Sequence, residues 1–312
     1  KWADVVYIPR CWYSAIPLAK TYNKPVVLHL HSYNLTCPMG SMYDLYNDNI
    51  CNNHICLPKC IVAHEKMTRQ GCVREFLSAS LNLSVWHLMR KFMELSDAII
   101  CVSNSEKKLM INRTPQLINK IKVIYNPIPN LSILPINGKD LGYFGGPSLL
   151  KGFHIILSAL KICEKKVTLH ATKFDSLKDS IKPVGNSKIL FYGMLSREQY
   201  WRIYKSISAV VVPSIWPETW CYVVTEGILR GRVIITSSVG GILEQVGSLK
   251  GCFTFAPKNN NELAEFIDYI EGFNKETLTE LGLKNREIFL KKFDNKTILK
   301  AFIDVLEKAY NE

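Results

Sequence analysis

Short apolar runs alternate with helical stretches along most of the chain. Two β-branched segments, residues 5–8 and 26–30, flank a helical stretch that extends to Tyr22. Strands that are apolar at consecutive positions and separated by helices are typical of a parallel sheet buried on both faces. The pattern therefore predicts an α/β protein. By the same criterion, further strands are expected at 98–102, 122–125, 141–144, 167–171, 189–192, 209–212 and 233–236.

Apolar residues also recur at helical spacing. Between residues 73 and 95, positions 81, 85, 88, 92 and 95 are apolar, which predicts an amphipathic helix. A polar, Cys-rich loop is expected from residue 32 to about 70. Ser105 is expected to cap a helix over 105–110, and Ser103 either caps a helix or faces a ligand. Other helices are expected from Lys151, over 197–206, after Pro217 and along the tail from Asn261.

One segment breaks the pattern and indicates a division of the chain. Residues 126–139 contain Pro127, Pro129, Pro135 and Gly138, which favour a linker. We expect a first domain over 1–139, which already begins in a buried strand and is therefore incomplete at its start. A second domain is expected over 140–290, and a C-terminal helix over 291–312 that packs back on the first domain. With 47% hydrophobic residues, both domains can form a core.

Composition narrows the possible partners. The formal net charge of +12 favours anionic partners, but it is spread over both halves, and no basic stripe with interleaved aromatics is present. Nucleic acid is therefore not an expected partner. No apolar run approaches the roughly 20 residues that span a bilayer. We expect a cytoplasmic protein, with peripheral contact at the inner membrane face as an option through the helix around Trp86 and Arg90.

Five of the ten cysteines lie close together in the first domain. Cys51, Cys56 and Cys60 have spacers of four and three residues and could bind zinc with Cys37 or Cys72, or with His54 or His64. Disulfides are an equal alternative and free thiols a third. In each case the expected role is structural, and the isolated cysteines are expected to act as small hydrophobic residues.

The strongest chemical signal is a pair of carboxylates near the start of a predicted helix. Glu218 and Glu226 are separated by seven residues, and eight residues of helix rise about 12 Å. That length matches the span from the sugar to the ribose of a nucleoside diphosphate sugar. The backbone N–H groups of Thr219, Trp220 and Cys221 would face the pyrophosphate at a helix N-terminus.

Two motifs resemble a known family. The segments 213–218 (Pro-Ser-Ile-Trp-Pro-Glu) and 239–244 (Val-Gly-Gly-Ile-Leu-Glu) are similar to those of retaining glycosyltransferase family four. The resemblance covers nearly the whole chain. It implies the GT-B fold, in which two Rossmann-like, doubly wound domains face each other across a cleft. It also implies transfer of a sugar from a nucleotide diphosphate sugar to an acceptor hydroxyl, with retention.

The resemblance assigns roles in the second domain. Glu226 would bind the ribose, Glu218 would contact the donor sugar and the reacting region, and Lys151 would neutralise the leaving diphosphate. Gly145 and Gly146 occupy the family's glycine and arginine positions, so the family's arginine is absent here. Lys173 is the candidate replacement. Gly193 and Met194 match positions where backbone groups bind the nucleobase.

The resemblance also assigns roles in the first domain. His31 would hold sugar hydroxyls as a neutral imidazole, and Asn126 matches the asparagine of the interlobe segment. His29 is expected to point to the opposite face of the strand. No Asp-x-Asp motif is present, and no catalytic metal is expected.

The resemblance leaves the substrates partly open. A UDP-sugar is the first candidate donor and a GDP-sugar the second, and the acceptor is a glycan or a lipid-linked sugar. A nucleotide-sugar epimerase of the same fold and a non-catalytic nucleotide-binding module are the alternatives to a transferase.

Overall fold

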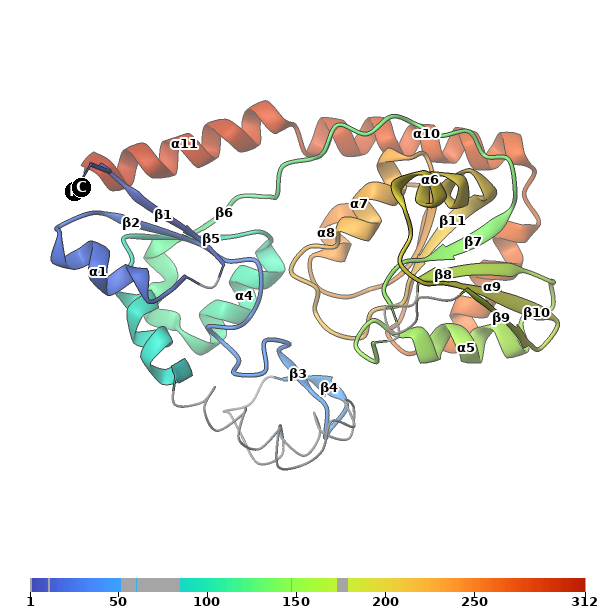
Figure 1. The fold of residues 1–312 in the computed structure, drawn as a ribbon, viewed down its shortest axis with the longest axis horizontal. Helices are drawn as coiled ribbons and strands as arrows, with labels where there is room; N and C mark the ends of the chain where they lie inside the picture. The colour runs from blue at the N-terminus through green and yellow to red at the C-terminus, as the bar shows by residue number, and fades with distance from the viewer. Residues whose placement is uncertain are drawn as a thin grey trace. The chain divides into compact units, whose positions relative to one another are not determined.

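The structure is a computed structural model that describes residues 2–10, 12–51, 60, 85–146, 148–172 and 179–311. The chain divides into two compact units, one formed by Lys1–Pro127 with Asp294–Glu312 and the other by Ile128–Phe293 (Figure 1). Each unit has its own parallel sheet. Within the described ranges, no helix is both long enough and apolar enough to cross a membrane.

The first unit is built on a four-stranded sheet in which every neighbouring pair is parallel. Parallel neighbours need crossover connections, which explains the helices between the strands. The strands, in spatial order, are β1 (Val6–Pro9), β2 (Val26–His29), β5 (Ala98–Cys101) and β6 (Ile121–Val123).

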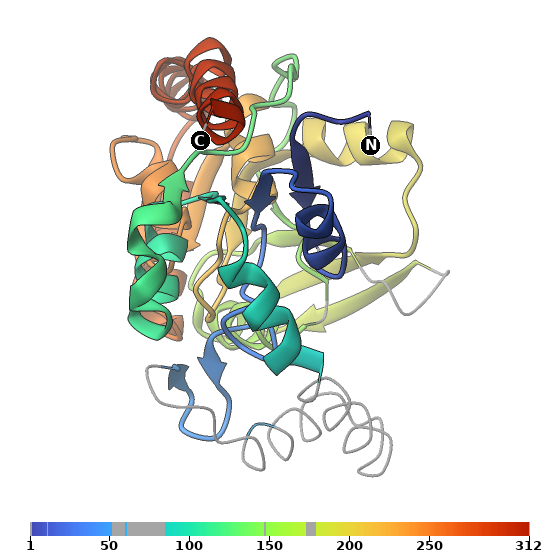
Figure 2. The same cartoon turned by 90° about the vertical axis from the view of Figure 1, so that its left-hand side faces the viewer.

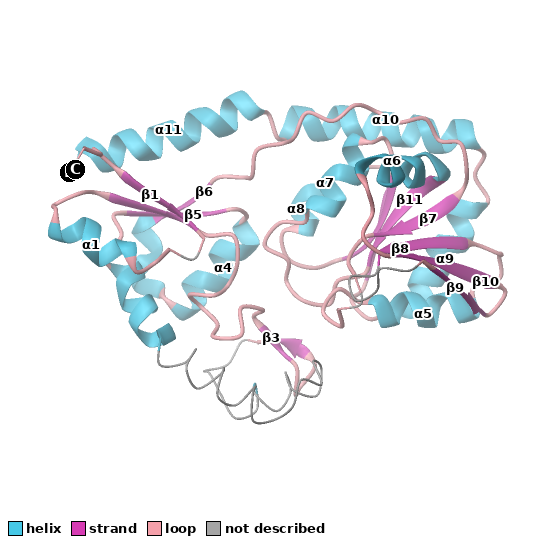
Figure 3. Cartoon of the chain, in the orientation of Figure 1, coloured by secondary structure: helices cyan, strands magenta, loops and turns pink. Residues whose placement is uncertain are grey.

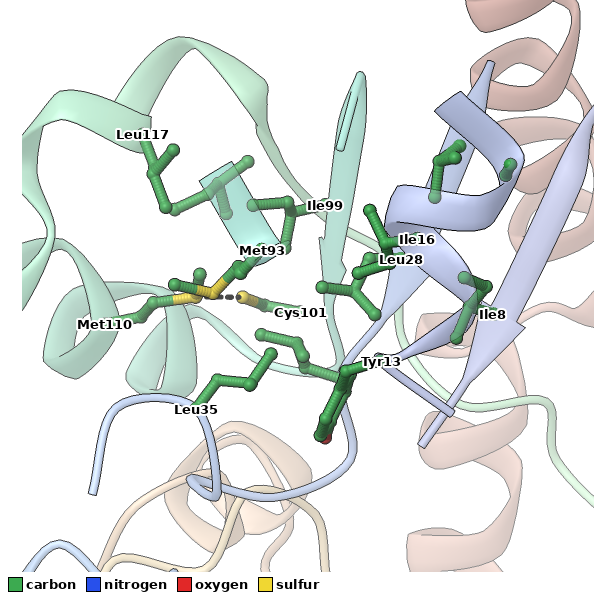
Figure 4. Close-up of a cluster of buried hydrophobic side chains, with 14 residues drawn as sticks. Ile8, Tyr13, Ile16, Leu28, Leu35, Met93, Ile99, Cys101, Met110 and Leu117 are labelled. Atoms are coloured by element: carbon green, nitrogen blue, oxygen red, sulfur yellow. Dashed lines mark hydrogen bonds between the residues drawn. The ribbon is translucent and has the colours of Figure 1, made fainter. Parts of the chain in front are cut away.

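Alternating residues of β2 pack into two separate cores. Val26 and Leu28 join one core, with residues of α1 (Ala15–Thr21), α4 (Asn104–Arg113) and the helical residues 85–94 (Figure 4). Val27 joins the other, with α11 (Asn295–Asn311). Successive side chains of a strand point to opposite faces, so a strand that is apolar throughout is covered on both. Figures 1 and 2 show α11 on one face of this sheet and α1 and α4 on the other.

Three expectations for the first unit need correction or restriction. Residues 32–51 are not entirely loop, because β3 (Tyr43–Asp44) and β4 (Asn49–Ile50) form an antiparallel pair. The cap of α4 is Ser103, whose hydroxyl accepts the Glu106 N–H at 3.1 Å, and the expectation of Ser105 is wrong. Of the helix expected at 73–95, residues 85–94 are helical and residues 73–84 lie outside the described ranges.

The second unit has a seven-stranded sheet in which all neighbours are parallel except β9 and β10. The connection from β6 to β7 carries neither helix nor strand (Figure 3). In spatial order the strands are β13 (Cys252–Phe255), β12 (Val233–Ser237), β11 (Ile207–Val212), β7 (Asp140–Tyr143), β8 (Thr168–Thr172), β10 (Ser187–Tyr192) and β9 (Ser180–Val184).

The order of the strands defines where a ligand is expected in this unit. The chain starts at β7, adds β8 and β10 on one side, and then adds β11, β12 and β13 on the other. The side of β7 on which successive strands are added therefore changes between β7 and β11, which run parallel to each other. In open α/β sheets, ligands bind outside the carboxyl ends of the strands at such a switch point. The helices of this unit are α5 (Phe153–Ile162), α6 (Arg197–Ser206), α7 (Tyr222–Leu229), α8 (Ile242–Val246), α9 (Asn260–Glu271) and α10 (Lys275–Lys292).

A buried arginine joins the connecting segment to the sheet of the second unit. Arg232 is fully buried, and its guanidinium donates to the carbonyls of Leu134 and Pro135, each at 3.0 Å, and to that of Tyr204 at 2.7 Å. Burial lowers the pKa of Arg232 to about 10, so the group stays charged at neutral pH. Leu134 and Pro135 belong to neither a helix nor a strand, and the guanidinium supplies a donor to their carbonyls.

Replacing this arginine should destabilise the second unit. We expect R232M to lower the free energy of unfolding by roughly 3 kcal/mol, because buried carbonyls lose their donor. Urea unfolding measures this, with R202A as the control, since Arg202 forms only an exposed ion pair with Glu198 on α6. Equal losses in the two variants would contradict the role of Arg232.

Candidate active site

The loops that follow β7 and β11 touch through their backbones. Gly152 has φ +74°, and a Cβ at this position would lie 1.8 Å from the carbonyl oxygen of Pro213. The N–H of Ile215 donates to the carbonyl of Leu150 at 2.9 Å. Only glycine tolerates both this φ and this contact. Lys151, the residue before Gly152, is thereby held beside the loop after β11.

The buried carboxylate of Glu218 receives three donors on a single oxygen. Its Oε1 accepts from Lys151 Nζ at 2.5 Å, from the Ser214 hydroxyl at 2.8 Å and from Trp216 Nε1 at 2.9 Å. Glu218 is 3% exposed, and the Lys151 side chain is about one-third exposed. A charge this deeply buried requires a partner charge and hydrogen bonds, and Glu218 has both.

A third loop, after β12, fixes the backbone of Glu218. Gly240 has φ +50°, and a Cβ there would lie 2.4 Å from the carbonyl oxygen of Glu218. The N–H of Gly241 donates to the same oxygen at 2.7 Å. Of the two glycines of the 239–244 motif, Gly240 allows the close backbone approach and Gly241 supplies the N–H. Three loops from neighbouring strands meet at Glu218, next to the switch point of the sheet.

A cavity of about 250 Å³ opens beside these groups. Lys151, Ser214, Glu218 and Cys221 line it together with apolar residues of β7 and β11, and among its described lining residues Lys151 is the only cation. Gly145 also lines it. Gly146 has φ +69°, and its carbonyl accepts the Tyr143 hydroxyl at 2.5 Å. Among the described lining residues, the charge of Lys151 favours an anionic group on its side of the cavity.

The start of α7 differs from the expected geometry. The helix begins at Tyr222, so residues 218–221 are not helical, and the estimate of 12 Å from helical rise does not apply to the two glutamates. The N–H of Cys221 already donates to Gln245 Oε1 at 3.0 Å. Thr219 and Trp220 are buried. The expected row of open N–H groups is therefore reduced at Cys221, where a side-chain amide takes the place of an anion.

Glu226 lies on α7 among aromatic rings. Its Oε2 accepts the hydroxyl of Tyr200 at 2.9 Å, and the Tyr200 ring packs edge-on against Phe144, which lines the cavity. Burial raises the pKa of Glu226, while the Tyr200 hydrogen bond and Arg230 oppose the rise. One carboxylate oxygen is thus occupied, and the group lies one ring away from the cavity wall.

The expected nucleobase positions follow β10. The N–H of Gly193 donates to Asp179 Oδ1 at 3.2 Å, so the group that was expected to bind a base has an internal partner. Met194 is 87% exposed. Lys173, the candidate replacement for the missing arginine, lies outside the described residues.

His31 and Asn126 belong to the first unit. Asn126 is buried after β6. The rings of His29 and His31 lie 4.3 Å apart, so the expectation that they point to opposite faces is wrong. Residues i and i+2 of an extended chain share a face. Burial, followed by the effect of the neighbouring His31, lowers the pKa of His29 to about 3. Burial, followed by the charge of Arg10, lowers the pKa of His31. Both imidazoles are neutral at pH 7.

The cysteine cluster falls partly outside the described residues. Cys37 is a buried free thiol, and Arg113 Nη2 donates to Cys51 Sγ at 2.9 Å. Cys56 and Cys72, like His54 and His64, are not among the described residues. Over the part of the chain that is described, no three His, Cys, Asp or Glu side chains gather as metal ligands would. A zinc site that uses Cys56 or Cys72 stays a prediction.

Trp86, the aromatic residue of the suggested membrane contact, is buried in the structure. Trp86 is only 5% exposed, and Arg90 lies over its ring at 5.7 Å. The ring therefore belongs to the core-facing side of the helix.

Sequence reasoning missed several residues that shape the site. Ser214, Trp216 and Tyr200 were not assigned roles, yet each donates to one of the two glutamates. The 213–218 motif is the signal that could have identified the first two, because it places a hydroxyl and an indole N–H within four residues of Glu218.

Comparison with known proteins identifies the family. The chain matches the family "Glycosyl transferases group 1" over residues 138–287 and "Glycosyltransferase Family 4" over residues 2–130. The two matches fall on the two halves and together cover most of the chain. The chain belongs to the group 1, family 4 glycosyltransferases. The resemblance noted from the two motifs is confirmed.

Two curated relatives share part of the sequence. An uncharacterized 42.6 kDa protein in the cps region of Klebsiella pneumoniae is 25% identical over 231 residues, which cover 71% of this chain and 59% of that protein. An uncharacterized glycosyltransferase of Methanocaldococcus jannaschii is 29% identical over 203 residues, which cover 55% of this chain and 50% of that protein. The matched region thus spans between half and three-fifths of each relative.

Solved structures confirm the fold class. Anabaena HepE, crystallised in complex with UDP-glucose, superposes with a TM-score of 0.66 at 19% identity, covering 97% of this chain and 78% of that chain. Sucrose-phosphate synthase from Thermosynechococcus elongatus gives 0.65 at 14% identity, covering 99% and 74%. The fold is GT-B, with a Rossmann-like sheet in each unit.

The burial of Glu226 predicts a pH dependence. Because its pKa is raised in the folded protein, ionisation opposes folding, and this carboxyl stabilises the protein most below its ordinary pKa of about 4.3. The stability it contributes is lost as the pH rises through the raised pKa. We expect the unfolding free energy of the wild type minus that of E226Q to fall between pH 4 and pH 8 in denaturant titrations without nucleotide. The matched variant E265Q, at an exposed position of α9, should show a flat difference, and a rising curve for E226Q would contradict the assignment.

Proposed function

We propose that the chain transfers a sugar from a nucleotide diphosphate sugar to an acceptor hydroxyl, with retention at the anomeric carbon. The observation that carries this proposal is the convergence of Lys151 and Glu218 on one cavity at the switch point of the second sheet. A cation and a carboxylate that share a cavity can contact the diphosphate and the sugar of one donor. Retention of the anomeric configuration is inferred from the resemblance to the retaining family.

In the proposed reaction, charged side chains contact the diphosphate, the sugar and the ribose of the donor. When the bond from the anomeric carbon to the phosphate oxygen breaks, its electron pair stays on the diphosphate, and Lys151 stabilises that charge. The acceptor oxygen forms the new bond to the anomeric carbon, and its proton leaves to the solvent or the phosphate. Glu218 contacts sugar hydroxyls, and Glu226 accepts from a ribose hydroxyl through the oxygen that Tyr200 does not occupy.

A UDP-sugar is the first candidate donor. HepE, with the same fold, is described in complex with UDP-glucose, and a GDP-sugar is the second candidate. Gly193 and Met194 would lie near the base, with Asp179 as a further polar neighbour. His31 and Asn126 are proposed to contribute from the first unit, and Lys173 to add positive charge near the diphosphate. The acceptor is proposed to be a glycan or a lipid-linked sugar.

Calorimetric titration with UDP, GDP and their sugar conjugates tests the donor site. We expect micromolar binding of one nucleotide series, and E226A should weaken it about 10- to 150-fold through loss of a charge-assisted hydrogen bond. E265A, a matched change at an exposed glutamate, should bind as the wild type does. Unchanged affinity in E226A would refute the ribose assignment, and absence of binding to either series would refute the donor site.

Turnover separates a transferase from a nucleotide-binding module. K151A and E218Q should lower the rate of sugar transfer at least about 100-fold while nucleotide binding persists, because their proposed contacts strengthen as charge develops. Single-turnover assays with the donor that binds and a panel of sugar acceptors measure this rate. A fully active K151A/E218Q variant would overturn both roles. Conversion of the donor sugar without an acceptor would identify an epimerase instead.

A further inference from the structure

Trp216 contacts both members of the buried ion pair. Its Nε1 donates to Glu218 Oε1 at 2.9 Å, and Lys151 Nζ lies 5.2 Å from the centroid of its ring. A cation over an indole face is attracted by the ring quadrupole. The same side chain therefore meets the carboxylate through its edge and the ammonium through its face.

The local sequence explains this arrangement. Ser214, Trp216 and Glu218 lie on one short non-helical segment, and the side chains of the first two both donate to Glu218 Oε1. Pro217 restricts the backbone between the last two, and the N–H of Glu218 donates to the carbonyl of Trp216 at 2.9 Å. The indole and the carboxylate are thus joined through backbone and side chain alike.

The hydrogen bonds also distinguish the two carboxylate oxygens. All three side-chain donors go to Oε1, and the carboxylate lines the cavity at 3% exposure. The indole N–H is a donor only and carries no charge. The indole could therefore keep donating to Oε1 if Lys151 turned toward an anionic ligand, which would leave Oε2 to contact that ligand.

We propose that Trp216 is a positioning residue, which orients the Glu218 carboxylate and the Lys151 ammonium in the donor cavity. The role rests on the proposed function, because it is defined by the contacts those two groups make with a nucleotide sugar. Trp216 itself does not touch the reacting atoms. It acts by holding Oε1, so that a sugar hydroxyl meets Oε2 in one orientation.

The variant W216F tests the hydrogen bond while an aromatic ring stays beside Lys151. We expect turnover to fall about 10- to 100-fold, the loss of one hydrogen bond to a charged group, with the affinity for free nucleotide within about threefold of the wild type. W2F, at a 94% exposed tryptophan, is the matched control and should retain full activity. A turnover in W216F equal to that in W2F would overturn the proposal.

A double-mutant cycle with E218Q asks whether Trp216 acts through Glu218. If it does, W216F lowers turnover by less than about threefold in the E218Q background, because the carboxylate it positions is already absent. An equal loss in both backgrounds would assign Trp216 a purely structural role and overturn the proposal.

The same cycle in unfolding free energy needs no activity. Coupling between W216F and E218Q supports the contact, and additive losses overturn it. If the wild type transfers sugar from no donor, the proposed function fails while this cycle still decides whether Trp216 holds the carboxylate. The two failures are therefore distinguishable.

Discussion

The contact of Gly152 with the carbonyl of Pro213 is the constraint on which the candidate site depends. With no room for a Cβ, the loop after β7 lies directly against the loop after β11, and Lys151 can only emerge beside Glu218. Gly240, in the loop after β12, makes a second contact of this kind, with the carbonyl of Glu218. The switch point of the sheet brings these loops to one edge, and the glycines remove the remaining distance between their backbones.

This tight backbone arrangement explains how a carboxylate can be buried in the cavity. A carboxylate at 3% exposure is removed from water and needs internal partners, and Glu218 has a cation and two neutral donors on one oxygen. Lys151 remains partly exposed, so it can exchange this carboxylate for a more highly charged anion. In the proposed function, Lys151 is the cation that meets the diphosphate, and Gly146 occupies the position of the family's arginine.

The buried strands could be predicted from the sequence, and the exposed ones could not. The expected strand at 209–212 lies within β11, which begins two residues earlier. Residues 209–212 are all apolar and buried, and for this reason the pattern identifies them. By contrast, β9 (Ser-Ile-Lys-Pro-Val) is an exposed edge strand with a proline and a lysine, which carries no apolar pattern. The β3–β4 pair is two residues long on each side, too short for any periodicity.

In the candidate site, contacts between residues close in the sequence could be predicted, and contacts between residues far apart in the sequence could not. Glu218 and Ser214 are four residues apart, so a sequence motif can contain both. Tyr200 and Glu226 are 26 positions apart on different helices, and the packing of both α6 and α7 on β11 brings the hydroxyl to the carboxylate. The non-helical backbone of residues 218–221 could not be predicted from the local pattern either, because the Gln245 amide that satisfies the Cys221 N–H comes from α8. Residues that position others are thus the hardest to predict, since their partners, not their own neighbours, define them.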